Sequence, residues 1–129
     1  MSELSILYVD DEPDIREVAV VSLEIDPGIE VRAVDSGAAA LEALADPSWT
    51  PSVILLDVMM PVLDGPGTLA RLRTLPGHGE TPVVFITASV QAHEQARLME
   101  LGATAVIAKP FDPMTLASQV RAALAAHGR

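Results

Sequence analysis

Cysteine is absent from the 129-residue chain, and aromatic side chains make up only 3% of it. The lack of thiols excludes disulfides, zinc–thiolate sites and thiol catalysis, and it is typical of a cytoplasmic protein. No apolar run approaches the roughly 18 residues of a membrane span. The N-terminus also lacks the basic segment of a signal peptide. We therefore expect a cytoplasmic protein with no membrane partner.

Basic residues are also few. The chain has 8 Lys and Arg against 18 Asp and Glu, which gives a formal net charge of −10 at pH 7. Nucleic acid binding depends on clustered Lys and Arg that neutralise phosphates, so we expect no direct nucleic acid partner. The acidic balance is compatible with a divalent cation or with a basic protein surface.

Strand-like and helix-like segments alternate along the chain, which suits a single domain over residues 1–129. The pattern predicts strands at 4–9, 29–34, 53–58, 83–88 and 104–108. It predicts helices at 14–25, 91–100 and 112–126, and two more that follow the second and third strands. Either Asp35 or Ser36 is expected to cap the second helix. Five such units predict an α/β fold, a doubly wound, five-stranded parallel sheet with helices on both faces.

Reactive side chains stand where the predicted strands end. They are Asp10 and Asp11 after the first strand, Asp57 at the end of the third, Thr87 and Ala88 at the end of the fourth, and Lys109 after the fifth. Ligands of open parallel sheets bind at this edge. Because adjacent carboxylates repel, the three aspartates predict a positively charged partner between them.

Four motifs resemble those of the receiver (response-regulator) domains of two-component signalling. They are "VDDE", "LLDVMMPVLDG", "ITA" and "KPF", and they follow the family's order over nearly the whole chain. The resemblance implies a flavodoxin-like (βα)5 fold with strand order 2-1-3-4-5. It also implies a signalling protein that catalyses only its own phosphorylation and dephosphorylation, rather than an enzyme.

The resemblance further implies a role for each strand-end residue. Asp57 would be the phosphoacceptor, taking a phosphoryl group from a phosphohistidine of a sensor histidine kinase or a histidine phosphotransfer protein. Mg²⁺ would be the cofactor, held by Asp11, Asp57 and the backbone carbonyl of Met59, and by Asp10 largely through water. Oxygen ligands of this kind are those that Mg²⁺ prefers.

The remaining positions would bind the phosphoryl group and report its presence. Lys109 would pair with the carboxylates and then with a phosphoryl oxygen, turned inward by a cis bond to Pro110. The Thr87 hydroxyl and the Ala88 backbone N–H would bind other phosphoryl oxygens. The resulting movement would switch a surface that binds a downstream protein target or output domain.

Two features depart from the family pattern. Val106 occupies the position where the family commonly has Tyr or Phe, so the usual aromatic readout is missing. Met59 and Ser89, at the positions that flank the hydrolytic water, supply no strong water-orienting group. We therefore predict a comparatively long-lived phosphoryl group.

Three other protein classes have parts of this pattern. A dehalogenase-like phosphohydrolase requires a second acid two residues after its nucleophile, and that position is Met59. A dinucleotide-binding oxidoreductase requires glycines where "VDDEPD" stands. A phosphorylation-independent interaction module stays open, with Val106 as its support.

Two further expectations concern the end of the chain and the histidines. We expect no output domain after residue 126. The chain could be a stand-alone regulator, a phosphate shuttle or a receiver from a longer protein. His78, His93 and His127 are predicted to be ordinary surface residues rather than phosphohistidine donors.

Overall fold

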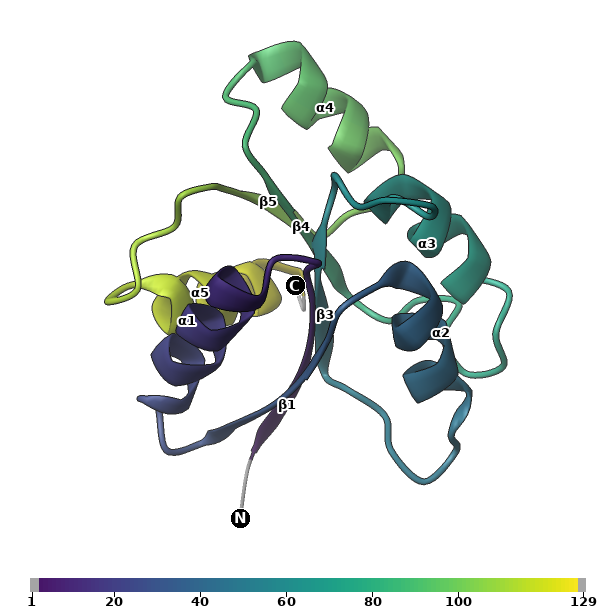
Figure 1. The fold of residues 1–129 in the computed structure, drawn as a ribbon, viewed down its shortest axis with the longest axis horizontal. Coiled ribbons are helices and arrows are strands. Elements are labelled where there is room, and N and C mark those ends of the chain that lie inside the picture. Colours follow the sequence, from purple (N-terminus) through teal and green to yellow (C-terminus); the bar gives the residue numbers. More distant parts are fainter. Residues whose placement is uncertain (1–2, 128–129) are drawn as a thin grey trace.

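The computed structural model describes residues 3–127, in which five strands alternate with five helices (Figure 1). The strands are β1 (Leu4–Val9), β2 (Ile29–Val34), β3 (Val53–Asp57), β4 (Val83–Thr87) and β5 (Ala105–Ala108). The helices are α1 (Pro13–Glu24), α2 (Gly37–Ala45), α3 (Gly65–Leu72), α4 (Ala92–Glu100) and α5 (Leu116–His127). The ends of the predicted 1–129 domain lie outside the described residues.

These elements agree with the predicted pattern except at one helix start. The last helix begins at Leu116 instead of residue 112. Asp112 is used in a turn before it, where its Oδ1 accepts a hydrogen bond from the Met114 N–H at 2.9 Å. Aspartate often closes such turns with its side chain, which delays the helix.

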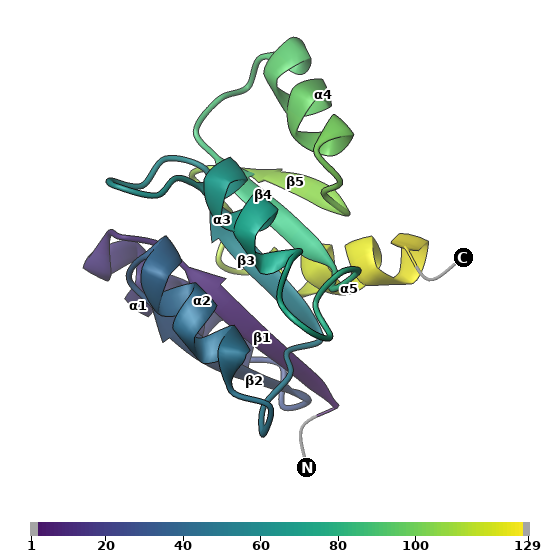
Figure 2. The ribbon, with the colours of Figure 1, turned by 90° about the vertical axis from the view of Figure 1, so that its right-hand side faces the viewer.

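The five strands form one parallel sheet in the order β2-β1-β3-β4-β5, as predicted. Helices α1 and α5 lie on one side of it, and α2 and α3 lie on the other (Figure 1). In the turned view, α4 lies beside β4 and β5 at the far edge of the molecule (Figure 2). None of the helices in the described part of the chain has the length and apolar character needed to cross a membrane.

The sheet separates two apolar clusters. One side carries Ile6, Tyr8, Val53, Leu55, Val84, Ile86 and Ile107, which pack with α1 and α5. The other side carries Leu7, Val9, Ile54, Leu56, Val83 and Phe85, which pack with α2, α3 and α4. Because side chains alternate along a strand, each strand contributes to both clusters.

The same alternation decides where the strand-end residues point. Asp10 continues the series of Ile6 and Tyr8, Asp57 continues that of Val53 and Leu55, and Lys109 continues that of Ile107. All three therefore belong to the side covered by α1 and α5. Thr87 instead continues the series of Val83 and Phe85, on the side covered by α4.

Short polar residues begin two of the helices. Ser36, rather than Asp35, caps α2, and its Oγ accepts a hydrogen bond from the Ala39 N–H at 3.0 Å. Asp64 caps α3 by accepting one from the Gly67 N–H at 2.8 Å. Such caps satisfy N–H groups that have no partner within the helix.

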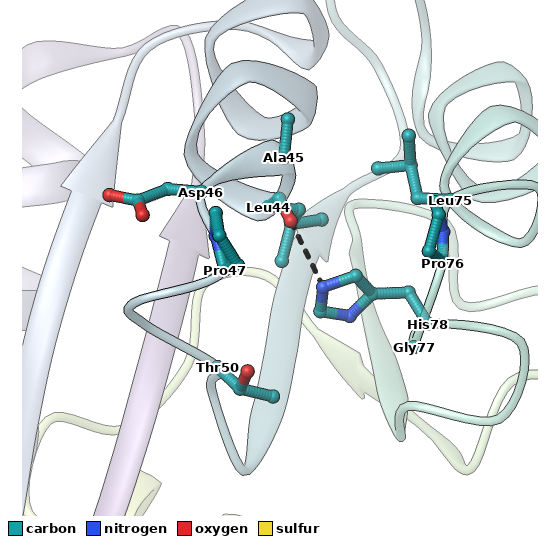
Figure 3. Close-up of a pocket in the computed structure, with 9 residues that line it drawn as sticks. All are labelled: Leu44, Ala45, Asp46, Pro47, Thr50, Leu75, Pro76, Gly77 and His78. Atoms are coloured by element: carbon teal, nitrogen blue, oxygen red, sulfur yellow. Dashed lines mark hydrogen bonds between the residues drawn. The ribbon is translucent and has the colours of Figure 1, made fainter.

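One predicted surface residue is buried. His78 is only 4% exposed, and its Nε2 lies 3.1 Å from the Leu44 carbonyl oxygen at the end of α2 (Figure 3). Its Nδ1 lies 3.0 Å from the Thr81 hydroxyl. The prediction was wrong for His78 because the α3–β4 loop folds back against α2, a contact between distant parts of the sequence. His93 is exposed as predicted, and the side chain of His127 lies outside the described residues.

Gly65 allows α3 to begin directly against the end of β3. A Cβ at this position would lie 2.6 Å from the Asp57 carbonyl oxygen and 2.9 Å from the Val58 Cα. We expect Gly65→Ala to lower the free energy of unfolding by about 1–3 kcal/mol, because backbone atoms must move to admit the methyl group. Chemical denaturation would measure the change.

Gly79→Ala is the matched control, since a Cβ there meets nothing within 4 Å. It should change the free energy of unfolding by less than about 0.5 kcal/mol. Equal effects of the two substitutions would show that the close approach at Gly65 does not constrain the fold.

Candidate functional site

Three carboxylates meet at the carboxyl edge of the sheet. Asp10, Asp11 and Asp57 each offer an oxygen, and these atoms all lie within 4.8 Å of one another. Asp10 is 0% exposed and Asp57 is 4% exposed, whereas Asp11 reaches solvent. The register explains the meeting, because β1 and β3 are neighbours and pair Val9 with Leu56. The structure thus brings together the three carboxylates among the predicted metal ligands.

Lys109 supplies the positive charge beside them. Its Nζ lies 2.9 Å from Asp10 Oδ2 and 3.2 Å from Asp57 Oδ2, and its side chain is 13% exposed. Its backbone N–H donates to the Thr87 carbonyl at 2.7 Å, which holds the end of β5 against β4. The Lys109–Pro110 bond is cis, as the sequence resemblance implied.

Asp10 has partners on both carboxylate oxygens. Oδ1 accepts a hydrogen bond from the Glu12 N–H at 3.0 Å, and Oδ2 accepts one from the Tyr8 hydroxyl at 3.1 Å in addition to Lys109. The Arg16 guanidinium donates to the Asp10 backbone carbonyl at 2.8 Å. Asp10 is therefore held in one orientation and has little capacity left for a direct ligand.

The pKa values of the buried groups follow from this crowding. Burial, and then repulsion by Asp10, raises the pKa of Asp57 to about 6, while Lys109 and the Met59 N–H oppose the rise. Burial also raises the pKa of Tyr8, with further contributions from the charge of Asp10 and its hydrogen bond. Burial lowers the pKa of Lys109, but its contacts with Asp10 and Asp57 outweigh that effect and raise it overall. Lys109 therefore stays charged at neutral pH.

The donor set fits a small, hard cation. Asp11 accepts no hydrogen bond and joins no ion pair within residues 3–127, so its oxygens are available. Asp57 uses one oxygen for Lys109. Mg²⁺ usually takes one or two carboxylates and keeps several waters, so Asp11 and Asp57 suffice as direct ligands. Asp10, already held by Lys109, Tyr8 and the Glu12 N–H, keeps an acceptor position on Oδ1, which suits contact with the cation through a water.

The other predicted residues flank this cluster. Met59 follows Asp57 by two residues in an exposed loop, and its N–H donates to the Asp57 carboxylate. Ala88 is exposed directly after β4. Thr87 is buried, and its Oγ1 accepts a hydrogen bond from the Ser89 N–H at 3.0 Å. Its hydroxyl is thus used within the β4–α4 loop.

Sequence reasoning missed three contributors. Tyr8 and Arg16 both donate hydrogen bonds to Asp10. For Tyr8 the sequence does hold a signal, because the alternation of the first strand places it on the same side of the sheet as Asp10. Glu12 is exposed, but its Oε1 lies 3.4 Å from the Lys109 Nζ. Val106 is half-buried opposite Phe85, on the side of the sheet that α4 covers.

Comparison with known proteins agrees with this arrangement. Residues 6–121 match the response regulator receiver domain family. This chain belongs to that family. It is 37% identical over 119 residues to the probable transcriptional regulator ycf27 of Pyropia yezoensis, covering 92% of this chain and 46% of the relative. It is 35% identical over 128 residues to the uncharacterized transcriptional regulatory protein YkoG of Bacillus subtilis, covering 99% and 54%.

Solved receiver-like structures share the fold. The chemotaxis response regulator CheY4 of Vibrio cholerae superposes with a TM-score of 0.84 at 29% identity, over 93% of this chain and 98% of that one. The receiver fold and its strand order are therefore confirmed. The chain spans about half the length of the curated relatives that it matches.

The raised pKa of Asp57 gives a prediction for stability. The folded-state pKa is about 6 and the reference value is 3.8. Between these two pH values the Asp57 carboxyl is ionised in the unfolded chain but largely protonated in the folded protein. The free energy of unfolding therefore falls as pH rises through this range. We expect Asp57→Asn, measured in chelator, to raise the free energy of unfolding by about 1–3 kcal/mol at pH 7 and by little at pH 4.

Asp35→Asn is the matched control, because Asp35 also follows a strand but is exposed. It should change stability by less than about 0.5 kcal/mol at both pH values. A less stable Asp57→Asn protein at pH 7, or a gain that is the same at pH 4, would contradict the electrostatic account.

Proposed function

We propose that this receiver domain accepts a phosphoryl group on Asp57 and thereby switches a protein-binding surface. The observation that carries the proposal is the Lys109 ammonium between Asp57 and Asp10, with Asp11 beside them in reach of solvent. A simple acidic patch would be solvated, whereas two of these carboxylates are buried. Burying like charges is unfavourable, which supports a function that requires them together.

The proposed reaction is phosphoryl transfer from a phosphohistidine. An Asp57 carboxylate oxygen bonds to phosphorus while the phosphorus–nitrogen bond breaks. The electron pair of that bond stays on the imidazole nitrogen, which leaves as neutral histidine after taking up a proton. The product on Asp57 is an acyl phosphate. Such transfers depend on positioning and on neutralising phosphoryl charge more than on covalent chemistry by the protein.

Mg²⁺ is the cofactor that the donor set fits best. Asp11, Asp57 and the Met59 carbonyl would hold it, with Asp10 acting through water. When bound, it would neutralise charge on the phosphoryl oxygens.

The cationic and neutral donors have separate proposed roles. Lys109, released from Asp57 as that carboxylate is phosphorylated, binds a phosphoryl oxygen through its flexible ammonium. The Thr87 hydroxyl and the Ala88 N–H donate to the remaining oxygens. Ala88 also leaves the site open, since its side chain is small and exposed.

The proposed partners follow from the chemistry and from the relatives. A sensor histidine kinase or a histidine phosphotransfer protein would be the phosphodonor, in the cytoplasm. The relatives are named as transcriptional regulators and are about twice as long. We propose that residues 1–129 act as one receiver domain whose output is a downstream protein or output domain, with no nucleic acid contact of its own.

Incubation with acetyl phosphate and Mg²⁺ tests the phosphoacceptor. We expect intact mass spectrometry to detect the gain of one phosphoryl group on the wild-type protein. The gain should be absent from Asp57→Asn and from a sample in chelator. It should persist in Asp35→Asn, which changes a strand-end aspartate outside the cluster.

A gain that persists in Asp57→Asn would reject Asp57 as the acceptor. No gain on the wild-type protein, from acetyl phosphate or from a panel of phosphorylated kinases, would favour a phosphorylation-independent interaction module.

The surroundings of Asp57 also predict a slow loss of the phosphoryl group. The Met59 thioether is a weak acceptor, and the Ser89 hydroxyl already accepts a hydrogen bond from the Gln91 N–H at 3.3 Å. Neither side chain supplies the charged or amide group that would orient an attacking water strongly. We expect the acyl phosphate to survive for minutes or longer in a mass-spectrometric time course after acetyl phosphate is removed.

Met59→Asn supplies an amide that can orient water, and we expect it to speed decay about tenfold. Met114→Asn is the control, since Met114 is 79% exposed, much like Met59 at 76%. Decay of the wild-type acyl phosphate within seconds would contradict this prediction.

A further inference from the structure

The β4–α4 loop, residues 88–91, is tied to both its flanking elements by a short series of hydrogen bonds. The Ser89 N–H donates to Thr87 Oγ1 at 3.0 Å, and the Gln91 N–H donates to Ser89 Oγ at 3.3 Å. The Gln95 side-chain amide, from the first half of α4, donates to the Ser89 carbonyl at 3.2 Å. Ser89 therefore links the buried threonine of the site to helix α4.

We propose that Gln95 is a positioning residue that holds the β4–α4 loop in its resting arrangement and opposes the movement of Thr87 toward a phosphorylated Asp57. This inference rests on the proposed function and adds to it a specific regulator of the switch. Gln95 acts through Ser89 and does not contact the reacting atoms.

The side of the sheet on which Thr87 lies supports this role. By strand alternation Thr87 belongs to the side covered by α4, while Asp57 and Lys109 belong to the other. For its hydroxyl to reach an oxygen on Asp57, Thr87 must change its orientation. That change moves Oγ1 relative to the Ser89 N–H, and Ser89 is in turn held by Gln95.

Helix α4 has few other constraints. Leu98 is its single buried residue, whereas α3 buries four. In both ribbon views α4 lies at the margin of the molecule (Figures 1 and 2). A helix with so little buried apolar surface is readily displaced, so one side-chain hydrogen bond is a substantial part of its attachment.

Val106 increases the importance of this contact. It lies on the same side of the sheet as Thr87, on the neighbouring strand. Its short aliphatic side chain has no donor or acceptor and cannot report a movement of the threonine by hydrogen bonding. The Gln95 side chain makes the hydrogen bond that joins Ser89 directly to the body of α4, and the Gln91 N–H adds a contact from the helix cap to Ser89 Oγ.

Beryllofluoride with Mg²⁺, a non-covalent mimic of the phosphoryl group, tests the proposal. We expect Gln95→Ala and Gln95→Glu, which both remove the donor, to lower its apparent dissociation constant about two- to tenfold, the size of one net hydrogen bond. Gln95→Lys, which keeps a donor, should stay near the wild-type value. Amide resonances followed by NMR during the titration would give each constant.

The matched control is Gln119→Ala on the exposed face of α5, which has no side-chain hydrogen bond in residues 3–127. A purely structural role of Gln95 would lower stability without changing the affinity for beryllofluoride. Unchanged affinity in the Gln95 variants, or weaker binding, would overturn the proposal.

Amide hydrogen exchange in the resting protein separates this inference from the proposed function. Gln95→Ala should speed exchange at Ser89 and Gln91 severalfold, and Gln119→Ala should not. If the wild-type protein neither gains a phosphoryl group from acetyl phosphate nor binds beryllofluoride, the proposed function is rejected. Exchange that is equal in both variants would reject the Gln95 contact, whatever the phosphorylation result.

Discussion

Two buried carboxylates that repel each other, Asp10 and Asp57, share the single ammonium of Lys109, and the carboxyl edge of the sheet is arranged around that contact. Burial raises the pKa of Asp57 and favours its neutral form, whereas the lysine favours the charged form. Tyr8 and the Glu12 N–H hold Asp10 in place. The site therefore holds three carboxylates beside one ammonium, more negative charge than its own cation balances.

The fold and much of this site were predictable from sequence because both depend on local periodicity. Apolar runs of strand length that alternate with helical segments predict the parallel sheet. The residue at the end of each predicted strand can then be identified from the sequence. Asp10, Asp57 and Lys109 even share one side of the sheet for a reason visible in the sequence, since each continues the alternation of its own strand. Pairing of β1 with β3 then brings the two aspartates together.

What the sequence did not reveal depends on contacts between distant segments. The sequence predicts a surface histidine at His78, which lies in a loop. It is buried because that loop packs against the end of α2, where its ring contacts a carbonyl oxygen 34 positions away in the chain. The start of α5 was placed too early because helical periodicity continues through Asp112, which the structure uses in a turn. The Arg16 contact with the Asp10 carbonyl has no sequence signal, since an arginine on an outer helix face is ordinarily solvated.

The absence of an aromatic residue at Val106 changes how a signal can leave the site. A ring that rotates into space vacated by Thr87 would couple β5 to its neighbour β4 by packing. With valine there, packing between β4 and β5 can change little, because a β-branched side chain has few rotamers. In the switch proposed above, coupling then passes through the β4–α4 loop, where hydrogen bonds to Ser89 join Thr87 to α4. Since Leu98 is the single buried residue of α4, little buried apolar surface would oppose a displacement of that helix.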